Sequence, residues 1–202
     1  MNQNHSKNKL LDIKIITLGD SRVGKTSLIV KYIDNKFTGT FVTTMGFDIK
    51  NKQITLKDET EAKMMLFDTA GQERFRSLAE NYIKKANGVL LVYDISERES
   101  FKNIENWVDS IRENSDELPT ILIGNKSDLN EERKVSYEEG KQKADEYGCS
   151  FYETSCKTGD NVNKCFIELS ELVYEKIGKK PSQQSGQELK KTNSKSKKKG
   201  CC

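Results

Sequence analysis

One motif of eight residues restricts the possible folds of this chain more than any other feature. Residues 19–26, GDSRVGKT, fit the pattern G-x-x-x-x-G-K-[ST]. They follow an apolar run at 13–18 that is typical of a buried strand, and they open a stretch from Lys25 to Ile33 that is typical of a helix. A loop between a strand and a helix is the context in which this pattern holds phosphate. A chance glycine turn before a helix is the alternative interpretation, and the further motifs described below argue against it.

The chemistry of this loop suits the polyphosphate of a nucleotide. Its glycines let the backbone approach phosphate oxygens, while successive N–H groups and the positive end of the helix attract the anion. Lys25 is expected to reach the β- and γ-phosphates, and the Thr26 hydroxyl to ligate Mg²⁺. Arg22 stands where small residues are common, and it either faces solvent or touches phosphate. The predicted nucleotide contacts in this region are Asp20, Ser21, Arg22, Val23, Gly24, Lys25, Thr26 and Ser27.

Length and composition favour one domain with a polar extension at each end. Within the 202 residues we expect a disordered arm at 1–9, a domain at 10–178 and a disordered tail at 179–202. The only histidine, His5, lies in the arm, which argues against histidine catalysis and histidine-rich metal sites. No apolar run is long enough to span a bilayer, and no amino-terminal signal is recognisable. Three cysteines within the domain, at 149, 156 and 165, are therefore expected to be free thiols in a reducing cytosol.

Charge is distributed unevenly between the domain and the tail. Eight lysines and Glu188 give the segment 179–202 a charge of +7, so the rest of the chain carries −4 of the net +3. A nucleic-acid-binding domain shows the reverse arrangement. We therefore expect no nucleic-acid partner.

Apolar runs alternate with amphipathic runs along the domain, which predicts an α/β fold with a mostly parallel sheet covered on both faces. A polar run at 57–61 predicts a hairpin between the second and third strands. Ligands of such sheets bind at the carboxyl ends of the strands, where the motifs fall. The predicted strands are 11–18, 47–56, 62–67, 88–93, 120–124 and 150–153, and the predicted helices are 25–33, 74–85, 99–113, 136–147 and 162–177. Trp107, in the third of these helices, is expected to pack in the core.

A second group of polar residues follows the third strand. Asp68, at the end of a buried strand, is placed to hold the hydration shell of Mg²⁺. Gly71 allows a backbone N–H to approach the terminal phosphate, and Gln72 can orient a water molecule for in-line attack. In the polar connection 37–46, Thr43 and Thr44 both offer a hydroxyl to the metal. An Asx turn that closes the strand is the alternative for Asp68.

A third group predicts recognition of a guanine base. Asn125, Lys126 and Asp128 follow the fifth strand, and Ser155, Cys156 and Lys157 follow the sixth. The Asp128 carboxylate can accept hydrogen bonds from guanine N1–H and its 2-amino group, whereas against adenine it would stay desolvated and unpaired. The Lys126 stem can cover the base, and a backbone N–H at 155–157 can meet the guanine carbonyl oxygen.

With these motifs in order, the chain resembles a Ras-superfamily small GTPase, and within that superfamily the Rab family. The resemblance rests on GDS at 19–21, TMGFD at 44–48, DTAGQERFRS at 68–77, LVYDI at 91–95 and GCC at 200–202. It implies a P-loop small G domain with a six-stranded sheet that has one antiparallel edge strand. It also implies that Thr44 rather than Thr43 is the switch threonine, that Phe37 packs on guanine, and that Phe41 covers the phosphates. The chain departs from the Rab pattern at Phe67, Ile49, 81–86, Cys156 and Arg22.

The tail ends in Cys201 and Cys202 after a run of lysines. Plain thiols on a solvated basic tail, or a nuclear-import run, are the alternatives. The resemblance implies that both cysteines are geranylgeranylated, and two lipids beside a basic patch give stable membrane anchoring.

The resemblance implies a GTP-hydrolysing switch of vesicle trafficking, in which Mg²⁺ is the cofactor and Gln72, Lys25 and Thr44 act on GTP. Implied partners are an exchange factor, an activating protein, a GDP-dissociation inhibitor, a Rab escort protein with its prenyltransferase, and effectors. The implied location is the cytosol and the cytoplasmic face of an endomembrane or the plasma membrane. A nucleotide-binding scaffold without turnover and an ATP-dependent kinase or ATPase are the alternatives.

Overall fold

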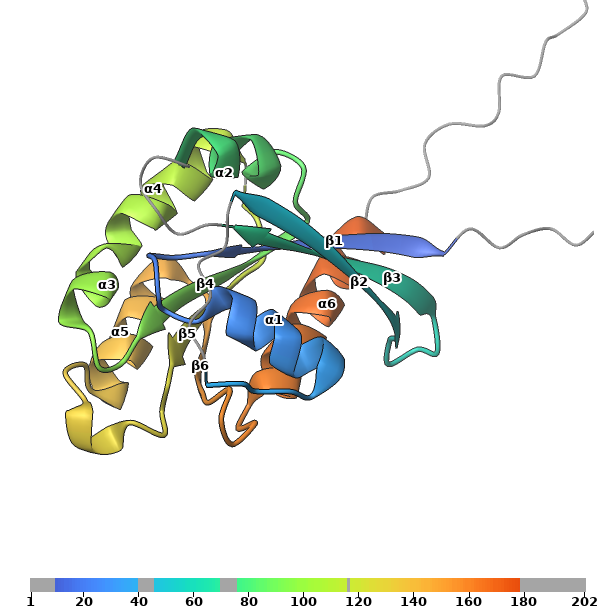
Figure 1. The fold of residues 1–202 in the computed structure, drawn as a ribbon. Helices are drawn as coiled ribbons and strands as arrows, with labels where there is room; N and C mark the ends of the chain where they lie inside the picture. The colour runs from blue at the N-terminus through green and yellow to red at the C-terminus, as the bar shows by residue number, and fades with distance from the viewer. Residues whose placement is uncertain (1–9, 40–45, 70–75, 116, 179–202) are drawn as a thin grey trace, which may run out of the picture.

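The computed structural model describes residues 10–39, 46–69, 76–115 and 117–178, in which strands and helices alternate (Figure 1). The strands are β1 (Leu11–Leu18), β2 (Phe47–Thr55), β3 (Glu61–Thr69), β4 (Gly88–Asp94), β5 (Thr120–Asn125) and β6 (Ser150–Thr154). The α-helices are α1 (Lys25–Asp34), α2 (Arg76–Ile83), α3 (Arg98–Lys102), α4 (Ile104–Asn114), α5 (Tyr137–Tyr147) and α6 (Val162–Gly178). A short 3₁₀ helix, η2 (Asn130–Glu132), precedes α5.

The six strands form one sheet in the order β2-β3-β1-β4-β5-β6. Only β2 and β3 pair antiparallel, joined by the predicted hairpin, and every other pair is parallel. The predicted α/β fold with one antiparallel edge strand is thereby confirmed. Because β1, β3, β4, β5 and β6 run in the same direction, their carboxyl ends lie along one edge of the sheet. The motifs that follow them therefore meet there.

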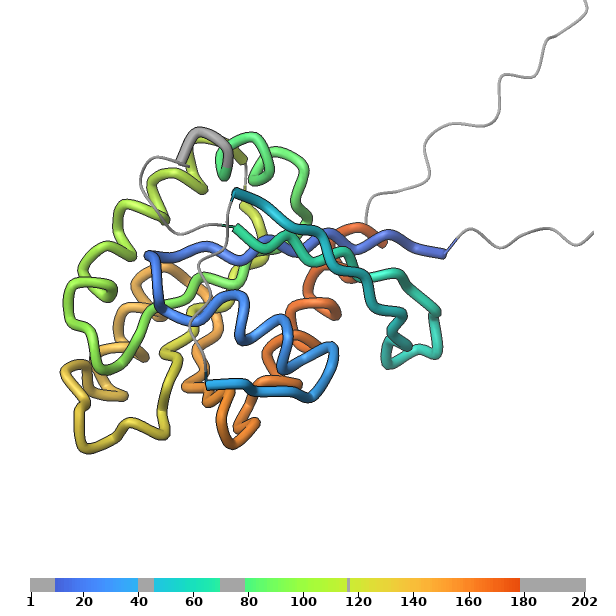
Figure 2. The backbone as a smooth tube through the Cα atoms, viewed as in Figure 1, coloured from blue at the N-terminus to red at the C-terminus, as the bar shows by residue number. Residues whose placement is uncertain are grey.

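Helices cover both faces of the sheet. Helices α1 and α6 pack on one face, and α2, α3, α4 and α5 pack on the other, as the backbone path shows (Figure 2). Strand β1 shows how the sequence produces this arrangement. Ile13 and Ile15 face the first helical layer, while Ile16 and Leu18 face the second. Successive side chains of a strand point to opposite faces, so a nearly continuous apolar run is what a strand covered on both sides requires.

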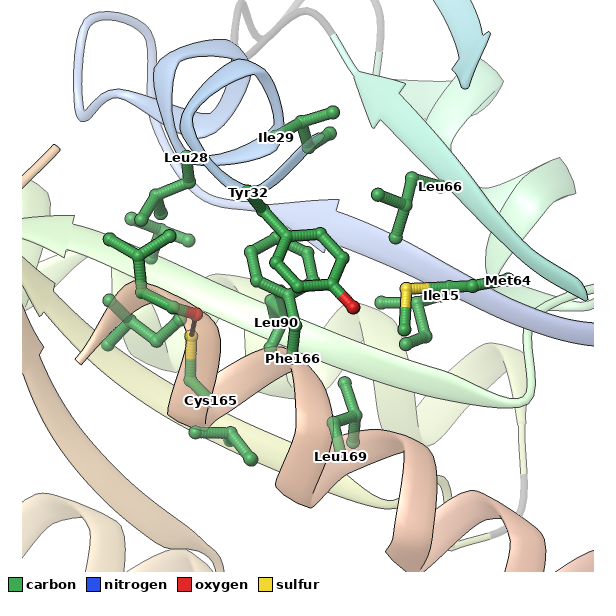
Figure 3. Packing of buried hydrophobic residues seen from close by; sticks show 14 of the residues in the cluster. Ile15, Leu28, Ile29, Tyr32, Met64, Leu66, Leu90, Cys165, Phe166 and Leu169 are labelled. Carbon is green, nitrogen blue, oxygen red and sulfur yellow. Dashed lines mark hydrogen bonds between the residues drawn. The ribbon is translucent and has the colours of Figure 1, made fainter. Parts of the chain in front are cut away.

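A ring pair connects the two helices of the first layer. The rings of Tyr32 on α1 and Phe166 on α6 are stacked with centroids 4.1 Å apart, in the same buried cluster as Ile15, Met64 and Leu90 of the sheet (Figure 3). Both side chains are buried. Burial of a large apolar side chain of this kind contributes about 1.5–3 kcal/mol, so this pair fixes the end of α1 against the sheet. The start of α1 carries the phosphate-binding motif.

The structure differs from the sequence prediction in the third helix. The predicted single helix over 99–113 is wrong at Asn103, where α3 ends and α4 begins. Asn103 has φ −71° and ψ −6°, and its side-chain amide donates a hydrogen bond to Asp20 instead of facing solvent. The apolar period runs across this break, because Phe101, Ile104 and Trp107 all pack in the same cluster. Periodicity alone therefore gives no sign of the break.

None of the helices in the described part of the chain has both the length and the apolar character needed to traverse a lipid bilayer.

Candidate functional site

The phosphate-binding motif forms the loop between β1 and α1. Gly24 lies immediately before the helix with φ 99°, in the left-handed region that favours glycine. A Cβ added there would come within 2.3 Å of the Asn125 amide nitrogen, and one added at Gly19 would come within 2.0 Å of the Val92 carbonyl oxygen. The two glycines of the motif are thus required by close approach of the loop to β4 and β5. Arg22 also has a positive φ, 68°, and its side chain is exposed.

Lys25 is the buried cation of the site, with 5% of its surface exposed. Its Nζ donates hydrogen bonds to the carbonyl oxygens of Gly19, at 2.9 Å, and of Asp20, at 2.7 Å. Burial lowers the pKa of Lys25 from 10.5 to about 8, and the charges of Asp68 and Asp20 oppose that change. The loop therefore already holds a partly desolvated ammonium group where an anion would meet it.

This lowered pKa predicts a pH dependence for the ligand-free protein. Between pH 8 and 10.5, Lys25 is neutral in the folded state but protonated in the unfolded chain. Unfolding then takes up a proton, so the free energy of unfolding rises with pH, by at most about 1.4 kcal/mol per pH unit. Below pH 8 both states are protonated, and Lys25 contributes no slope. Urea denaturation of the wild type and of Lys25→Met at pH 7–10 measures how the free energy of unfolding changes with pH. Identical slopes above pH 8 in the two proteins contradict the prediction.

Asp68, at the end of β3, has one oxygen bound and one without a partner. The Thr26 hydroxyl donates to Oδ2 at 2.7 Å, while Oδ1 is buried with no hydrogen-bond partner among the described residues. Burial raises the pKa of this carboxyl, against the effects of Thr26 and Lys25. A buried carboxylate oxygen without a partner is costly, and a divalent cation that prefers oxygen ligands would satisfy it. Thr26 and Asp68 therefore fit the ligand set predicted for Mg²⁺.

Asn125 joins the phosphate loop to the base-recognition motifs. It is 1% exposed, and its amide nitrogen donates to the Val23 carbonyl oxygen at 2.8 Å. Its side-chain oxygen accepts from the Thr154 hydroxyl at 3.0 Å and from the Cys156 thiol at 3.7 Å. One side chain at the end of β5 thus ties together the loop after β1 and the loop after β6.

The other base-motif residues lie beside Asn125. Lys126 has φ 67°, and its Nζ forms an ion pair with Asp94 at 2.5 Å. The Asp128 side chain is exposed, and it accepts a hydrogen bond from the Ser155 hydroxyl at 2.6 Å. Ser155 and Cys156 are buried, whereas Lys157 is exposed. This leaves the Asp128 carboxylate oriented by Ser155 and open to a ligand.

The remaining predicted site residues comprise one that the structure describes and several that it does not. Phe37 is described and is 46% exposed, which leaves its ring free to cover a ligand. The others lie outside the described residues; they are Phe41, Thr43, Thr44, Gly71, Gln72, Cys201 and Cys202.

One contact of the phosphate loop is not predicted by the sequence pattern. The Asp20 carboxylate accepts hydrogen bonds from Asn103 at 2.7 Å and from the Trp107 indole N–H at 2.9 Å. Trp107 was expected to pack in the core, and its 5% exposure confirms this. The only available signal was general, because a buried tryptophan N–H usually finds an acceptor. Helical spacing says nothing about which acceptor.

Comparison with known proteins decides the family. A family model described as the Ras family matches residues 14–175, which reach from β1 into α6. The chain is 42% identical over 176 residues to Ras-related protein Rab-8 of Diplobatis ommata, covering 87% of this chain and 83% of the relative. The chain belongs to the Ras family, as a Rab small GTPase. Ras-related protein RABE1e of Arabidopsis thaliana is 41% identical over 182 residues, covering 89% and 83%. Ras-related protein SEC4 of Saccharomyces cerevisiae is 43% identical over 166 residues, covering 82% and 76%.

Membership of the Rab family establishes the general activity. As a Rab GTPase, the protein binds GTP and GDP, hydrolyses GTP and takes part in vesicle trafficking with regulators and effectors. The predicted family and general function are thereby confirmed. The GTPase reading also accounts for why Lys25, Asp68 and Asn125 converge at one edge of the sheet.

Proposed function

We propose that this Rab GTPase is a slow, Mg²⁺-dependent switch that a lipid anchor holds at a membrane. The observation that carries the proposal is the convergence of three strand ends. Lys25 and Thr26 follow β1, Asp68 lies in β3, and Asn125 ends β5 and bonds back to the phosphate loop. This convergence supports a site in which phosphate, metal and base would all be bound from one edge of the sheet.

Thr26 and Asp68 would hold Mg²⁺, with Thr44 as the further ligand. Ras-superfamily GTPases generally use Mg²⁺. The unpartnered Oδ1 of Asp68 and the Thr26 hydroxyl beside it support that assignment here. When bound, the ion neutralises negative charge on the phosphate oxygens.

Base selectivity comes from Asp128. Its carboxylate accepts from guanine N1–H and the 2-amino group while Ser155 fixes its orientation. The backbone at Ser155, Cys156 and Lys157 meets the guanine carbonyl oxygen. Phe37 and the Lys126 stem cover the base, and Phe41 covers the phosphates.

Hydrolysis depends on Gln72 and Lys25. Gln72 orients the attacking water, and the Lys25 ammonium stabilises charge that develops on the phosphate oxygens. The sequence pattern identifies no arginine of this chain as an arginine finger that would stabilise the transition state. We therefore propose that unaided hydrolysis is slow and that an activating protein accelerates it.

Replacing Gln72 with leucine tests the catalytic assignment. The change removes both the hydrogen-bond donor and the acceptor that orient the attacking water. Single-turnover GTP hydrolysis is therefore expected to slow by about 10- to 100-fold. This effect does not exceed the low end of the roughly 10²–10⁴-fold that a positioned proton-transfer group contributes. GDP affinity serves as the control and should stay at the wild-type value. Equal and negligible rates in both proteins, with and without activating protein, would favour the alternative of a scaffold that does not turn over.

The γ-phosphate sets the conformational state. Contacts from Thr44 and Gly71 to GTP order the segments 37–46 and 72–78, and loss of the phosphate releases them. The GTP form recruits effectors, and an exchange factor reloads GTP after hydrolysis. The GDP form is recycled through the cytosol by a GDP-dissociation inhibitor.

The tail provides the membrane anchor in this proposal. A Rab escort protein presents Cys201 and Cys202 to the prenyltransferase, and the neighbouring lysines add about 1 kcal/mol each near an anionic leaflet. The protein then divides between the cytosol and the cytoplasmic face of an endomembrane or the plasma membrane.

Removal of Cys201 and Cys202 tests this anchor. Without two lipid chains the lysines alone bind membrane only weakly, so a tagged chain that lacks both cysteines should lose its membrane fraction and become evenly cytosolic. Single serine replacements at each cysteine show whether one chain suffices. An unchanged distribution of the double variant in live cells would refute the lipid anchor.

A further inference from the structure

Asp20 connects the phosphate loop to the junction between α3 and α4. Both of its carboxylate oxygens are bound, Oδ2 by the Asn103 amide at 2.7 Å and Oδ1 by the Trp107 indole at 2.9 Å. The donors come from residues 83 and 87 positions later in the chain. Asn103 is the residue at which the helix breaks, so the break coincides with the side chain that reaches Asp20.

The same residue also holds Lys25. The Asp20 carbonyl oxygen accepts from Lys25 Nζ at 2.7 Å, beside the Gly19 carbonyl at 2.9 Å. Through its backbone Asp20 thus positions the ammonium group, and through its side chain it is itself held by α3 and α4. Hydrogen bonds to charged groups are stronger than neutral ones, so this two-sided attachment restrains the loop more than packing alone would.

We infer that Asp20 is a positioning residue that makes nucleotide retention depend on the α3–α4 junction, through Asn103 and Trp107. The inference rests on the nucleotide site described above. It gives the sole tryptophan of the chain a role beyond filling the core. A partner that pulls on this junction would loosen Lys25 without touching the nucleotide.

Replacing Asn103 with alanine removes one donor and leaves the carboxylate in place. We expect release of a fluorescent GDP analogue to become about tenfold faster, the factor that corresponds to about 1.4 kcal/mol. Trp107→Phe, which keeps the ring packing but removes the N–H, should speed release by a similar factor. The matched control is Val108→Ala, a core change on α4 at a side chain that is 8% exposed. It should lower Tm while release stays at the wild-type rate.

The outcomes separate positioning from plain stability. If Asn103→Ala and Trp107→Phe accelerate release and Val108→Ala does not, the inference stands. The inference is overturned if the rate of GDP release rises in proportion to the loss of Tm in all three variants. It is also overturned if Asn103→Ala and Trp107→Phe release GDP at the wild-type rate.

A measurement without nucleotide distinguishes failure of this inference from failure of the proposed nucleotide site. Asp20→Asn presents an N–H₂ group to one of the two donors, Asn103 and Trp107. Trp107 fluorescence in the ligand-free protein should therefore shift, because the carboxylate acceptor of its indole N–H is lost. Failure of wild-type GDP binding would refute the proposed site, whereas unchanged Trp107 emission in ligand-free Asp20→Asn would refute the positioning role.

Discussion

Lys25→Met is expected to weaken binding of both GDP and GTP by about 30- to 5,000-fold, because removal of one partner from a buried charge interaction typically costs about 2–5 kcal/mol. Lys25 is 5% exposed, so most of the cost of desolvating its ammonium group is met before the nucleotide arrives. Its only hydrogen-bond acceptors in the loop are the neutral carbonyls of Gly19 and Asp20, which cannot replace a phosphate.

Titration calorimetry with GDP in the presence of Mg²⁺ measures this effect. Lys36→Met is the matched control, since it removes one positive charge from an exposed side chain just after α1. We expect the control to bind GDP within about threefold of the wild type, because exposed charges contribute little. Below pH 8 the ligand-free Lys25→Met protein should resist urea at least as well as the wild type, because a buried ammonium group is costly. Equal losses of affinity in the two variants would show that general charge, not the buried cation, governs binding.

Asp128→Ala is expected to abolish the preference for guanine. Sites built to hydrogen-bond a particular polar group reject analogues that lack it by about 10⁴–10⁵-fold, and removal of the carboxylate forfeits most of that factor. Because the weak affinity for ATP changes little, affinity for GTP should fall by about 10⁴-fold. The exposed Asp128 is held by Ser155 at 2.6 Å, so its position depends on the end of β6 as well as β5.

Displacement of a fluorescent GDP analogue by GTP or ATP gives the ratio of affinities directly. Ser155→Ala serves as the matched variant, because it removes the hydrogen bond that orients Asp128 but leaves the carboxylate. It should reduce guanine preference by about tenfold, in line with loss of one hydrogen bond to a charged group. Displacement of the analogue by ATP and GTP at comparable concentrations from the wild type would favour the kinase or ATPase alternative.

The sheet and the positions of the motifs were predictable because the sequence pattern is local. The apolar run of β1 specifies two covered faces, and the polar run after β2 specifies a hairpin. Parallel strands then bring Lys25, Asp68 and Asn125 to the same edge without any knowledge of side-chain contacts.

The contacts between motifs were not predictable in the same way. The bond from Asn125 to the Val23 carbonyl, and the pair of bonds from Asn103 and Trp107 to Asp20, join residues more than 80 positions apart. Neither periodicity nor composition selects a partner at that separation, because both describe only residues that are near one another in the chain. The helix break at Asn103 belongs to the same class, since the apolar face continues across it. The structure therefore shows which distant residues become hydrogen-bond partners, and the sequence pattern does not.

Hydrogen exchange of the protein bound to GDP and to a non-hydrolysable GTP analogue shows whether the γ-phosphate controls the conformation. If the γ-phosphate controls the conformation, peptides that cover 37–46 and 70–78 should exchange more slowly in the GTP-analogue form, while peptides that cover 120–128 should exchange equally in both. Identical exchange at 37–46 and 70–78 in the two forms would contradict the account.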